Sequence, residues 1–138
     1  MTNTKLFIGM PVYNGEKFIA LALNSLCSQS FTNWKLLISD NCSTDRTSEI
    51  CSQFVSRDKR ISYVKQTENI GASGNFKFLL DRADEEFFMW ASSDDEWFPD
   101  FVLAGMTQLI ENENCGLAFA NMTNIDENGK PGRSYRSF

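Results

Sequence analysis

The sequence predicts an α/β fold, with a mainly parallel sheet flanked by helices on both faces. Short apolar runs with the length of strands recur along the chain, and stretches with helical periodicity separate them. Polar or turn-forming residues directly follow most of these runs. Strands that alternate with helices pair in parallel through right-handed crossovers, and such crossovers place helices on both faces of the sheet.

The apolar runs predict five strands, at residues 5–10, 34–38, 61–65, 87–91 and 116–122. We interpret the fourth run, Phe87 to Ala91, as a strand buried on both faces, because it is continuous and rich in aromatic residues. The segment from Asp126 to Lys130 combines Asp, Asn and Gly, and predicts a hairpin turn. Residues 131–138 show no pattern that indicates a regular element.

The stretches between the runs predict four helices. In the first, from Glu16 to about Gln29, Ile19, Leu23 and Leu26 recur at helical spacing.

The starts of the other three helices carry local signals. Ser43 or Thr44 is expected to cap the second helix. Gly71 and Gly74 precede the third and indicate an unusual backbone turn at its start. Pro99 indicates the start of the fourth.

Composition limits the classes of function. The 138 residues suit a single domain over 1–138, and the net charge of −5 without a basic block argues against a nucleic-acid partner. The absence of histidine excludes Ser-His-Asp and Cys-His catalysis and leaves carboxylates as the main acid, base and ligand candidates. No stretch approaches the roughly 20 apolar residues of a membrane span, and no signal pattern opens the chain, so we expect a cytoplasmic location.

Polar side chains follow several of the predicted strands at the point where each strand ends. Tyr13 and Asn14, then Asp40, then Asp94 and Asp95 occupy such positions. The carboxyl ends of parallel strands meet at one edge of a sheet, where ligands bind, so we expect these residues to line one crevice. Adjacent carboxylates repel each other, and a divalent cation compensates that repulsion. The alternative is a solvated acidic loop that caps the next helix.

Two common phosphate-binding motifs are absent. The chain contains neither G-x-G-x-x-G after its first strand nor G-x-x-x-x-G-K-[ST]. Metal bridging through Asp94 and Asp95 is therefore the better candidate for holding phosphate.

Four segments resemble motifs of the family 2 glycosyltransferases, which have a GT-A (Rossmann-like) fold. The first is Pro11-Val12-Tyr13-Asn14, and the second is Ser39 to Asp45, which resembles the family's Asp-Asp-Gly-Ser-Thr-Asp. The third is Asn69-Ile70-Gly71 with Asn75, which resembles the family's Asn-x-Gly and following Asn. The fourth is Ser92-Ser93-Asp94-Asp95, which resembles its Asp-x-Asp-Asp. The motifs occur in the family's order, and the resemblance extends from residue 5 to about 120.

The resemblance implies a nucleoside-diphosphate-sugar donor, usually a UDP-sugar, bound across the strand ends. The implied binding residues are Pro11, Val12, Tyr13, Asn14, Asp40, Asn41, Gly71, Asn75, Ser93 and Asp94. Asp40 would accept a hydrogen bond from the ring N–H of uracil. Asp95, with Asp94, would hold Mn²⁺ or Mg²⁺ against the two phosphates, and this ion would neutralise charge on the departing diphosphate.

The chain departs from the family pattern in two ways. Ser92 and Ser39 stand where we place the first acids of two motifs, which predicts a weaker metal site. No residue is a convincing catalytic base, because the remaining acids resemble surface positions of helices or turns: Glu111, Glu113, Asp126 and Glu127. We therefore expect a donor-binding part of a truncated enzyme, without the acceptor-binding C-terminal part.

The leading hypothesis is a metal-dependent, inverting glycosyltransferase domain that acts on a glycan or lipid-linked acceptor in cell-surface polysaccharide assembly. The expected partners include a membrane-associated protein, with this chain itself at the inner face of the membrane. They also include a second copy of the chain, in a homodimer formed through exposed apolar surface. One alternative is a non-catalytic nucleotide-sugar-binding or interaction module. A sugar-phosphate nucleotidyltransferase ranks last, because its basic, Gly-rich loop is replaced here by Pro-Val-Tyr-Asn.

Overall fold

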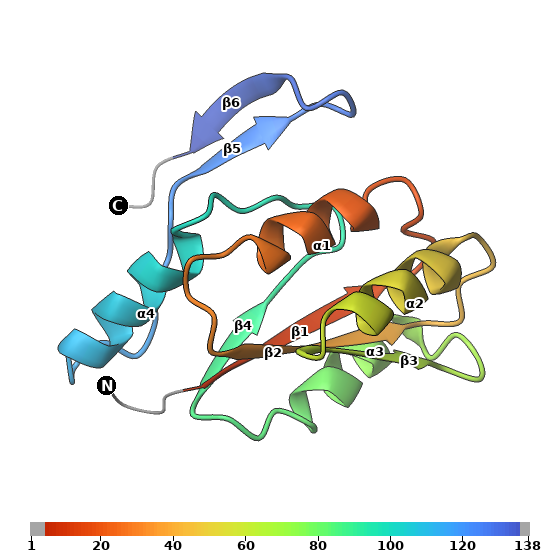
Figure 1. Cartoon of the computed structure of the whole chain (residues 1–138), viewed down its shortest axis with the longest axis horizontal. Helices are drawn as coiled ribbons and strands as arrows, with labels where there is room; N and C mark the ends of the chain where they lie inside the picture. Colours follow the sequence, from red (N-terminus) through yellow and green to blue (C-terminus); the bar gives the residue numbers. More distant parts are fainter. Residues whose placement is uncertain (1–4, 136–138) are drawn as a thin grey trace.

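The computed structural model describes residues 5–135 and contains a four-stranded parallel sheet with helices on both faces (Figure 1). The elements follow in the order β1 (Leu6–Val12), α1 (Ile19–Cys27), β2 (Trp34–Asp40), α2 (Thr47–Arg57), β3 (Ile61–Lys65), α3 (Gly71–Leu80), β4 (Phe87–Trp90), α4 (Phe101–Glu111), β5 (Met122–Ile125) and β6 (Pro131–Tyr135). The strand order in the sheet is β3-β2-β1-β4. The predicted α/β fold class is confirmed.

The register of the sheet brings the strand ends together. β1 and β2 run in parallel from the pair Leu6 and Trp34 to the pair Val12 and Asp40, so both strands end at the same level. β4 pairs with the other side of β1, and its pairing extends to Gly9. The loops that follow β1, β2 and β4 therefore start at one edge of the sheet.

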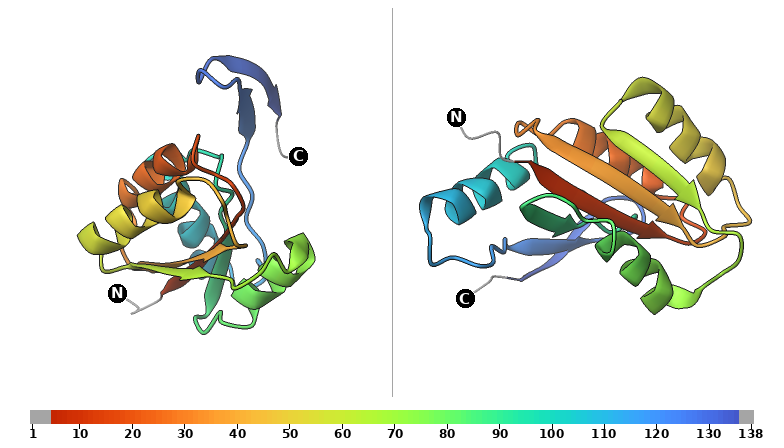
Figure 2. Two further views of the ribbon diagram at one scale, coloured as in Figure 1. Left: turned by 90° about the vertical axis from the view of Figure 1, so that its right-hand side faces the viewer. Right: turned by 90° about the horizontal axis from the view of Figure 1, so that it is seen from below.

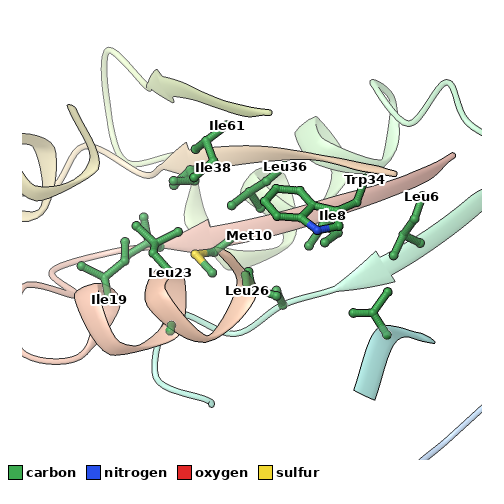
Figure 3. Close-up of a cluster of buried hydrophobic side chains, with 14 of the residues drawn as sticks. Leu6, Ile8, Met10, Ile19, Leu23, Leu26, Trp34, Leu36, Ile38 and Ile61 are labelled. Carbon is green, nitrogen blue, oxygen red and sulfur yellow. The ribbon is translucent and has the colours of Figure 1, made fainter. Parts of the chain in front are cut away.

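The hydrophobic core lies between α1 and the central strands (Figure 3). The fully buried side chains that meet there are Ile8 and Met10 of β1, Leu36 and Ile38 of β2, and Ile19, Leu23 and Leu26 of α1. Each such side chain contributes about 1.5–3 kcal/mol on burial. α1 and α2 cover this face of the sheet, whereas α3 covers the opposite face (Figure 2). Within residues 5–135, no helix is both long enough and apolar enough to cross a membrane.

Gln29 anchors α4 to the end of α1. Its side chain is 3% exposed; Nε2 donates a hydrogen bond to the Phe98 carbonyl oxygen at 2.8 Å, and Oε1 accepts one from the Val102 N–H at 3.0 Å. Val102 and Met106 then extend the core from α4. The loop between β4 and α4, which carries the predicted metal ligands, is thus fixed at its far end.

Aromatic rings fill the face of the sheet that α3 covers. The Phe88 ring lies 4.5 Å from the Trp90 ring, and the Trp90 ring lies 4.8 Å from that of Phe76 on α3. Gly9 leaves room for them, because a Cβ at this position would come within 3.1 Å of the Phe88 ring. The packing joins β4 to the middle of α3.

The prediction that Phe87 to Ala91 is buried on both faces is wrong for β4. Phe87, Phe88 and Met89 are only half-buried and Trp90 is exposed. β4 lies at an edge of the sheet, and among the described residues only β1 pairs with it. An aromatic run indicates a strand, but its burial depends on what covers its outer edge.

The predicted strand at 116–122 is also wrong. Residues 116–121 form no strand, and Leu117 and Phe119 are 65% and 76% exposed. An apolar run forms a strand only beside a partner, and no strand of residues 5–135 lies beside this one.

The predicted hairpin turn is confirmed. It joins β5 and β6, Gly129 has a φ of +77°, and Asp126 Oδ1 accepts hydrogen bonds from the N–H groups of Asn128 and Lys130. β6 itself was not expected, since Pro131–Tyr135 lacks apolar alternation and owes its conformation to pairing with β5. The end of the predicted irregular tail, 136–138, lies outside the described residues.

Candidate functional site

An open hollow of about 330 Å³ lies at the carboxyl ends of the strands. Its wall comes from the end of β1, the loops after β2 and β4, and the loop and first turns of α3. The lining residues are Pro11, Val12, Tyr13, Asn41, Asn69, Ala72, Asn75, Phe76, Ser92 and Ser93. This volume falls in the range of small-molecule sites, and the location is the edge where open α/β sheets bind ligands.

The residues predicted for the site divide into two groups. Those that line the hollow are Pro11, Val12, Tyr13, Asn41, Asn75 and Ser93. Those that do not line it are Asn14, Asp40, Gly71, Asp94 and Asp95. Four lining residues were absent from the prediction. Asn69 and Ser92 lie inside segments that the sequence already singled out, whereas Ala72 and Phe76 carry no signal in the sequence.

Hydrogen bonds join the loop after β1 to the loop after β2. The Asn14 N–H donates to Ser43 Oγ at 2.8 Å, and the Thr44 N–H donates back to Asn14 Oδ1 at 2.9 Å. The Gly15 N–H donates to Thr47 Oγ1 at 2.8 Å. We call the hydrogen bonds between residues 14–16 and 43–47 the loop bridge.

Asp45 and Glu16 complete the loop bridge. The Glu16 N–H donates to Asp45 Oδ2 at 3.0 Å, and the Arg46 N–H donates to Glu16 Oε2 at 2.9 Å. Asp45 Oδ1 also accepts the Thr47 N–H at 3.0 Å, at the start of α2. Burial alone would raise the pKa of the Asp45 carboxyl, but the hydrogen bonds from Thr47 and Glu16 hold it below its ordinary value.

The expectation that Ser43 or Thr44 caps the second helix is therefore wrong. Both residues bond to Asn14 across the loop bridge, and Asp45 supplies the oxygen that the first turn of α2 needs. Contacts between distant loops take precedence here over the local capping preference.

Asp40, the last residue of β2, is fully buried. Its Oδ1 accepts the Ser43 N–H at 2.8 Å and its Oδ2 accepts the Tyr63 hydroxyl at 2.6 Å. Burial, followed by this bond to Asp40, raises the pKa of the Tyr63 hydroxyl. The carboxylate thus has two partners inside the protein and holds the start of the β2–α2 loop. A contact between Asp40 and uracil stays a prediction.

Asn75 lines the hollow but uses its amide to attach α3 to β2. The side chain is 3% exposed; Nδ2 donates to the Ser39 carbonyl oxygen at 2.8 Å, and Oδ1 accepts the Ser39 hydroxyl at 2.6 Å. Gln66 Nε2 donates to the same hydroxyl at 3.0 Å. Ser39 is therefore a link between two elements under the hollow.

Asn41 and Asn69 shape the loop that enters α3. Asn41 Oδ1 accepts the Ile70 N–H at 2.8 Å, and Asn41 Nδ2 donates to Asn69 Oδ1 at 3.0 Å. The same Asn69 oxygen accepts the Gly71 N–H at 2.9 Å. Gly71 has a φ of +75°, which confirms the unusual backbone turn expected at the start of this helix.

Asp94 and Asp95 directly follow Ser93, a residue that lines the hollow, and both are exposed. Ser92 Oγ donates a hydrogen bond to Asp94 Oδ1. Desolvation, and then the negative charge of Asp94, raise the pKa of the Asp95 carboxyl above its ordinary value. Residues 5–135 contain no group of three or more His, Cys, Asp or Glu side chains that could hold a metal ion. The pair could supply two carboxylates to an ion that takes its other ligands from phosphates and water.

The chain belongs to glycosyl transferase family 2, since the model of the family described as "Glycosyl transferase family 2" matches residues 7–137. It is 32% identical over 133 residues to TuaG of Bacillus subtilis (strain 168), named as a teichuronic acid biosynthesis glycosyltransferase, and the match covers 95% of this chain and 52% of TuaG. It is 31% identical over 131 residues to the poly(ribitol-phosphate) β-N-acetylglucosaminyltransferase TarS of Staphylococcus aureus (strain Mu50), covering 92% of this chain and 22% of TarS.

Solved structures confirm the fold. TarS 1–349 of S. aureus in complex with UDP-GlcNAc superposes with a TM-score of 0.72 at 25% identity, over 85% of this chain and 38% of that one. The mannosyltransferase PcManGT of Pyrobaculum calidifontis, in complex with GDP-Man and Mn²⁺, superposes with a TM-score of 0.71 at 20% identity, over 80% of this chain and 33% of that one. This similarity concerns the fold alone. The fold is therefore GT-A, and the chain spans about half of TuaG and less of the other relatives.

The backbone changes one detail of the motif comparison. Cys42 has a φ of +67°, a conformation that favours glycine, so it fits the glycine of the family's Asp-Asp-Gly-Ser-Thr-Asp. Asp40 and Asn41 then take the places of the two acids, and Ser39 lies before the motif. The residue that departs from the family motif is therefore Asn41, which stands at the position of the second acid. The prediction that Ser39 replaces the first acid is wrong.

We predict that Thr47→Val destabilises the protein by about 1–3 kcal/mol, because the substitution keeps the volume but leaves the Gly15 N–H without its acceptor. Urea unfolding followed by circular dichroism measures the change. Thr107→Val on α4 is the matched control: its hydroxyl bonds only to the Leu103 carbonyl of its own helix, and its removal should change stability by less than about 0.5 kcal/mol. Equal losses in the two variants would contradict the role of the loop bridge.

Proposed function

We propose that this chain binds a nucleoside-diphosphate sugar, most simply a UDP-sugar, in the hollow at the carboxyl ends of the sheet. The observation that carries the proposal is the composition of that hollow in a chain of this family. Tyr13 and Phe76, which both line the hollow, are 52% and 43% exposed as residues, and a flat aromatic ring is a suitable surface for a nucleobase. Asn41, Asn69 and Ser93 add polar groups around them. The complex of TarS with UDP-GlcNAc supports the choice of a uridine donor.

We assign the divalent ion to Asp94 and Asp95. Two neighbouring carboxylates, one with a raised pKa, fit a cation that relieves their repulsion. Mn²⁺ or Mg²⁺ bound there would neutralise negative charge on the diphosphate leaving group. The Mn²⁺ in the complex of PcManGT agrees with this choice of ion, although that protein is similar in fold alone.

We further propose that the bound sugar is transferred with inversion to a glycan or lipid-linked acceptor in polysaccharide assembly. The names of TuaG and TarS, which refer to teichuronic acid and poly(ribitol-phosphate), support an acceptor of this class. The catalytic base remains unassigned, because no carboxylate of the described residues lines the hollow. That last observation also favours a second candidate, a nucleotide-sugar-binding module without transfer activity of its own. A membrane-associated partner, a site of action at the inner face of the membrane and a homodimer stay proposals.

Isothermal titration of the chain with UDP and with UDP-GlcNAc, in the presence of Mn²⁺, tests the proposed function. We expect saturable binding of both ligands. The absence of heat and of any shift in melting temperature at millimolar nucleotide would contradict the proposal. Hydrolysis or transfer of the sugar by this chain would decide against the second candidate.

We predict that Asp95→Asn weakens the Mn²⁺-dependent part of UDP binding by about tenfold or more, the scale on which metal sites respond to changes in their supporting groups. UDP affinity measured with Mn²⁺ and with EDTA gives this difference. Asp100→Asn is the matched control, since Asp100 is an exposed carboxylate of the same loop at the start of α4. A variant Asp95→Asn with the full Mn²⁺ effect would show that the ion binds elsewhere.

A further inference from the structure

Side chains around the C-terminal end of α1 hold the chain segment that follows the two acids proposed for the metal ion. Ser25 Oγ accepts the Trp97 N–H at 3.2 Å, a contact between residues 72 positions apart. Ser25 is half-buried and Trp97 packs against the core, so this bond is partly shielded from water. We call the hydrogen bonds of the Ser25 and Gln29 side chains to residues 97–102 the α1 clamp.

Gln29 forms the central part of the α1 clamp. Its buried Nε2 donates to the carbonyl oxygens of Phe98, at 2.8 Å, and of Ser25, at 3.1 Å. Its Oε1 accepts the Val102 N–H at 3.0 Å. The amide thus uses both of its donors and its acceptor inside the protein, and all three partners are backbone groups. An apolar side chain of similar size cannot make these bonds.

The two acids lie on a short irregular segment between two anchors. On one side, the Ala91 N–H donates to the Gly9 carbonyl oxygen at 3.0 Å and continues the pairing of β4 with β1. On the other side, the α1 clamp begins at Trp97. Residues 92–96 between these anchors form no helix or strand, and most of them are exposed. The two anchors therefore set where the acids stand relative to the sheet.

We propose that Ser25 and Gln29 are positioning residues for the divalent ion. By holding residues 97–102, the α1 clamp fixes the orientation in which Asp94 and Asp95 meet the ion. The inference rests on the proposed function, which assigns Mn²⁺ or Mg²⁺ to this pair. The ion needs both carboxylates in one arrangement, although their charges repel each other. A segment that is held at both ends has already lost the backbone freedom that ion binding would otherwise remove.

The variants Gln29→Met and Ser25→Ala each remove one part of the α1 clamp. Gln29→Met keeps an unbranched side chain of similar length but leaves the Val102 N–H without its acceptor. Ser25→Ala removes the other side-chain bond of the clamp. Both variants keep the backbone bond from the Ser30 N–H to the Pro99 carbonyl oxygen, so the segment stays attached to the end of α1.

The affinity for UDP with Mn²⁺, divided by the affinity with EDTA, measures the contribution of the ion. We expect this ratio to fall about tenfold in both variants, the scale on which metal sites respond to the loss of groups that orient their ligands. The affinity in EDTA should change by less than about twofold, because neither Ser25 nor Gln29 lines the hollow. A side chain that served folding alone would leave the ratio unchanged.

Two controls separate positioning of the ion from stability of the fold. Ser25→Thr keeps a hydroxyl that can accept the Trp97 N–H, and should retain the ratio of the wild type. Ile61→Ala removes a buried side chain at the first residue of β3, at the end of the strand remote from the hollow. This variant should lower the melting temperature and leave the ratio unchanged.

Isothermal titration of the full chain and its variants with UDP gives these ratios, and melting temperatures verify folding. If Gln29→Met does not fold, Ser25→Ala alone decides. A ratio in Ser25→Ala equal to that of the wild type would overturn the inference, as would an equal loss in Ile61→Ala. A wild type without any effect of Mn²⁺, or an Asp95→Asn variant with the full effect, would instead overturn the metal assignment of the proposed function, so the two failures are distinguishable.

Discussion

The loop bridge between residues 14–16 and 43–47 is the constraint on which the candidate site depends. Strands β1 and β2 end at the same level, and the bridge then fixes how the two chains leave the sheet. The N–H groups of residues 14–16 donate hydrogen bonds to side-chain oxygens of residues 43–47. In turn, the side chains of Asn14 and Glu16 accept hydrogen bonds from N–H groups of the second loop. The Ser-Thr-Asp part of the family motif thus has a structural explanation: these residues hold the turn that carries Tyr13 at the hollow.

A second layer of internal bonds supports the hollow from below and from the α3 side. Ser39 joins β2 to Asn75 of α3, and Asn41 joins the end of β2 to the loop that enters α3. Several polar residues that a motif comparison would assign to ligand binding therefore have structural partners. The groups left free for a ligand are fewer: the exposed residues Tyr13 and Phe76, the Asn69 amide, and the acids after β4.

The sequence was sufficient to predict the parallel sheet, the helices on both faces and the meeting of strand ends, because these follow from apolar periodicity and the chirality of crossovers. It could not show whether a polar residue at a strand end faces the ligand or the protein. Asp40 and Asn75 turn inward through partners more than 20 residues away. The predictions of a fully buried β4 and of a strand at 116–122 failed for a related reason. Both features depend on which other segments lie beside them, and an apolar run does not specify those segments.

A titration of ¹⁵N-labelled protein with UDP and Mg²⁺, followed by amide chemical shifts, tests the central claim most directly. The claim is that loops from separate strands form one nucleotide site. It predicts that the largest shifts fall together in four segments that border the hollow, at 12–14, 41–43, 69–72 and 92–95. Shifts that cluster on the β5–β6 hairpin or on α4, or that touch only one of the four segments, would contradict it.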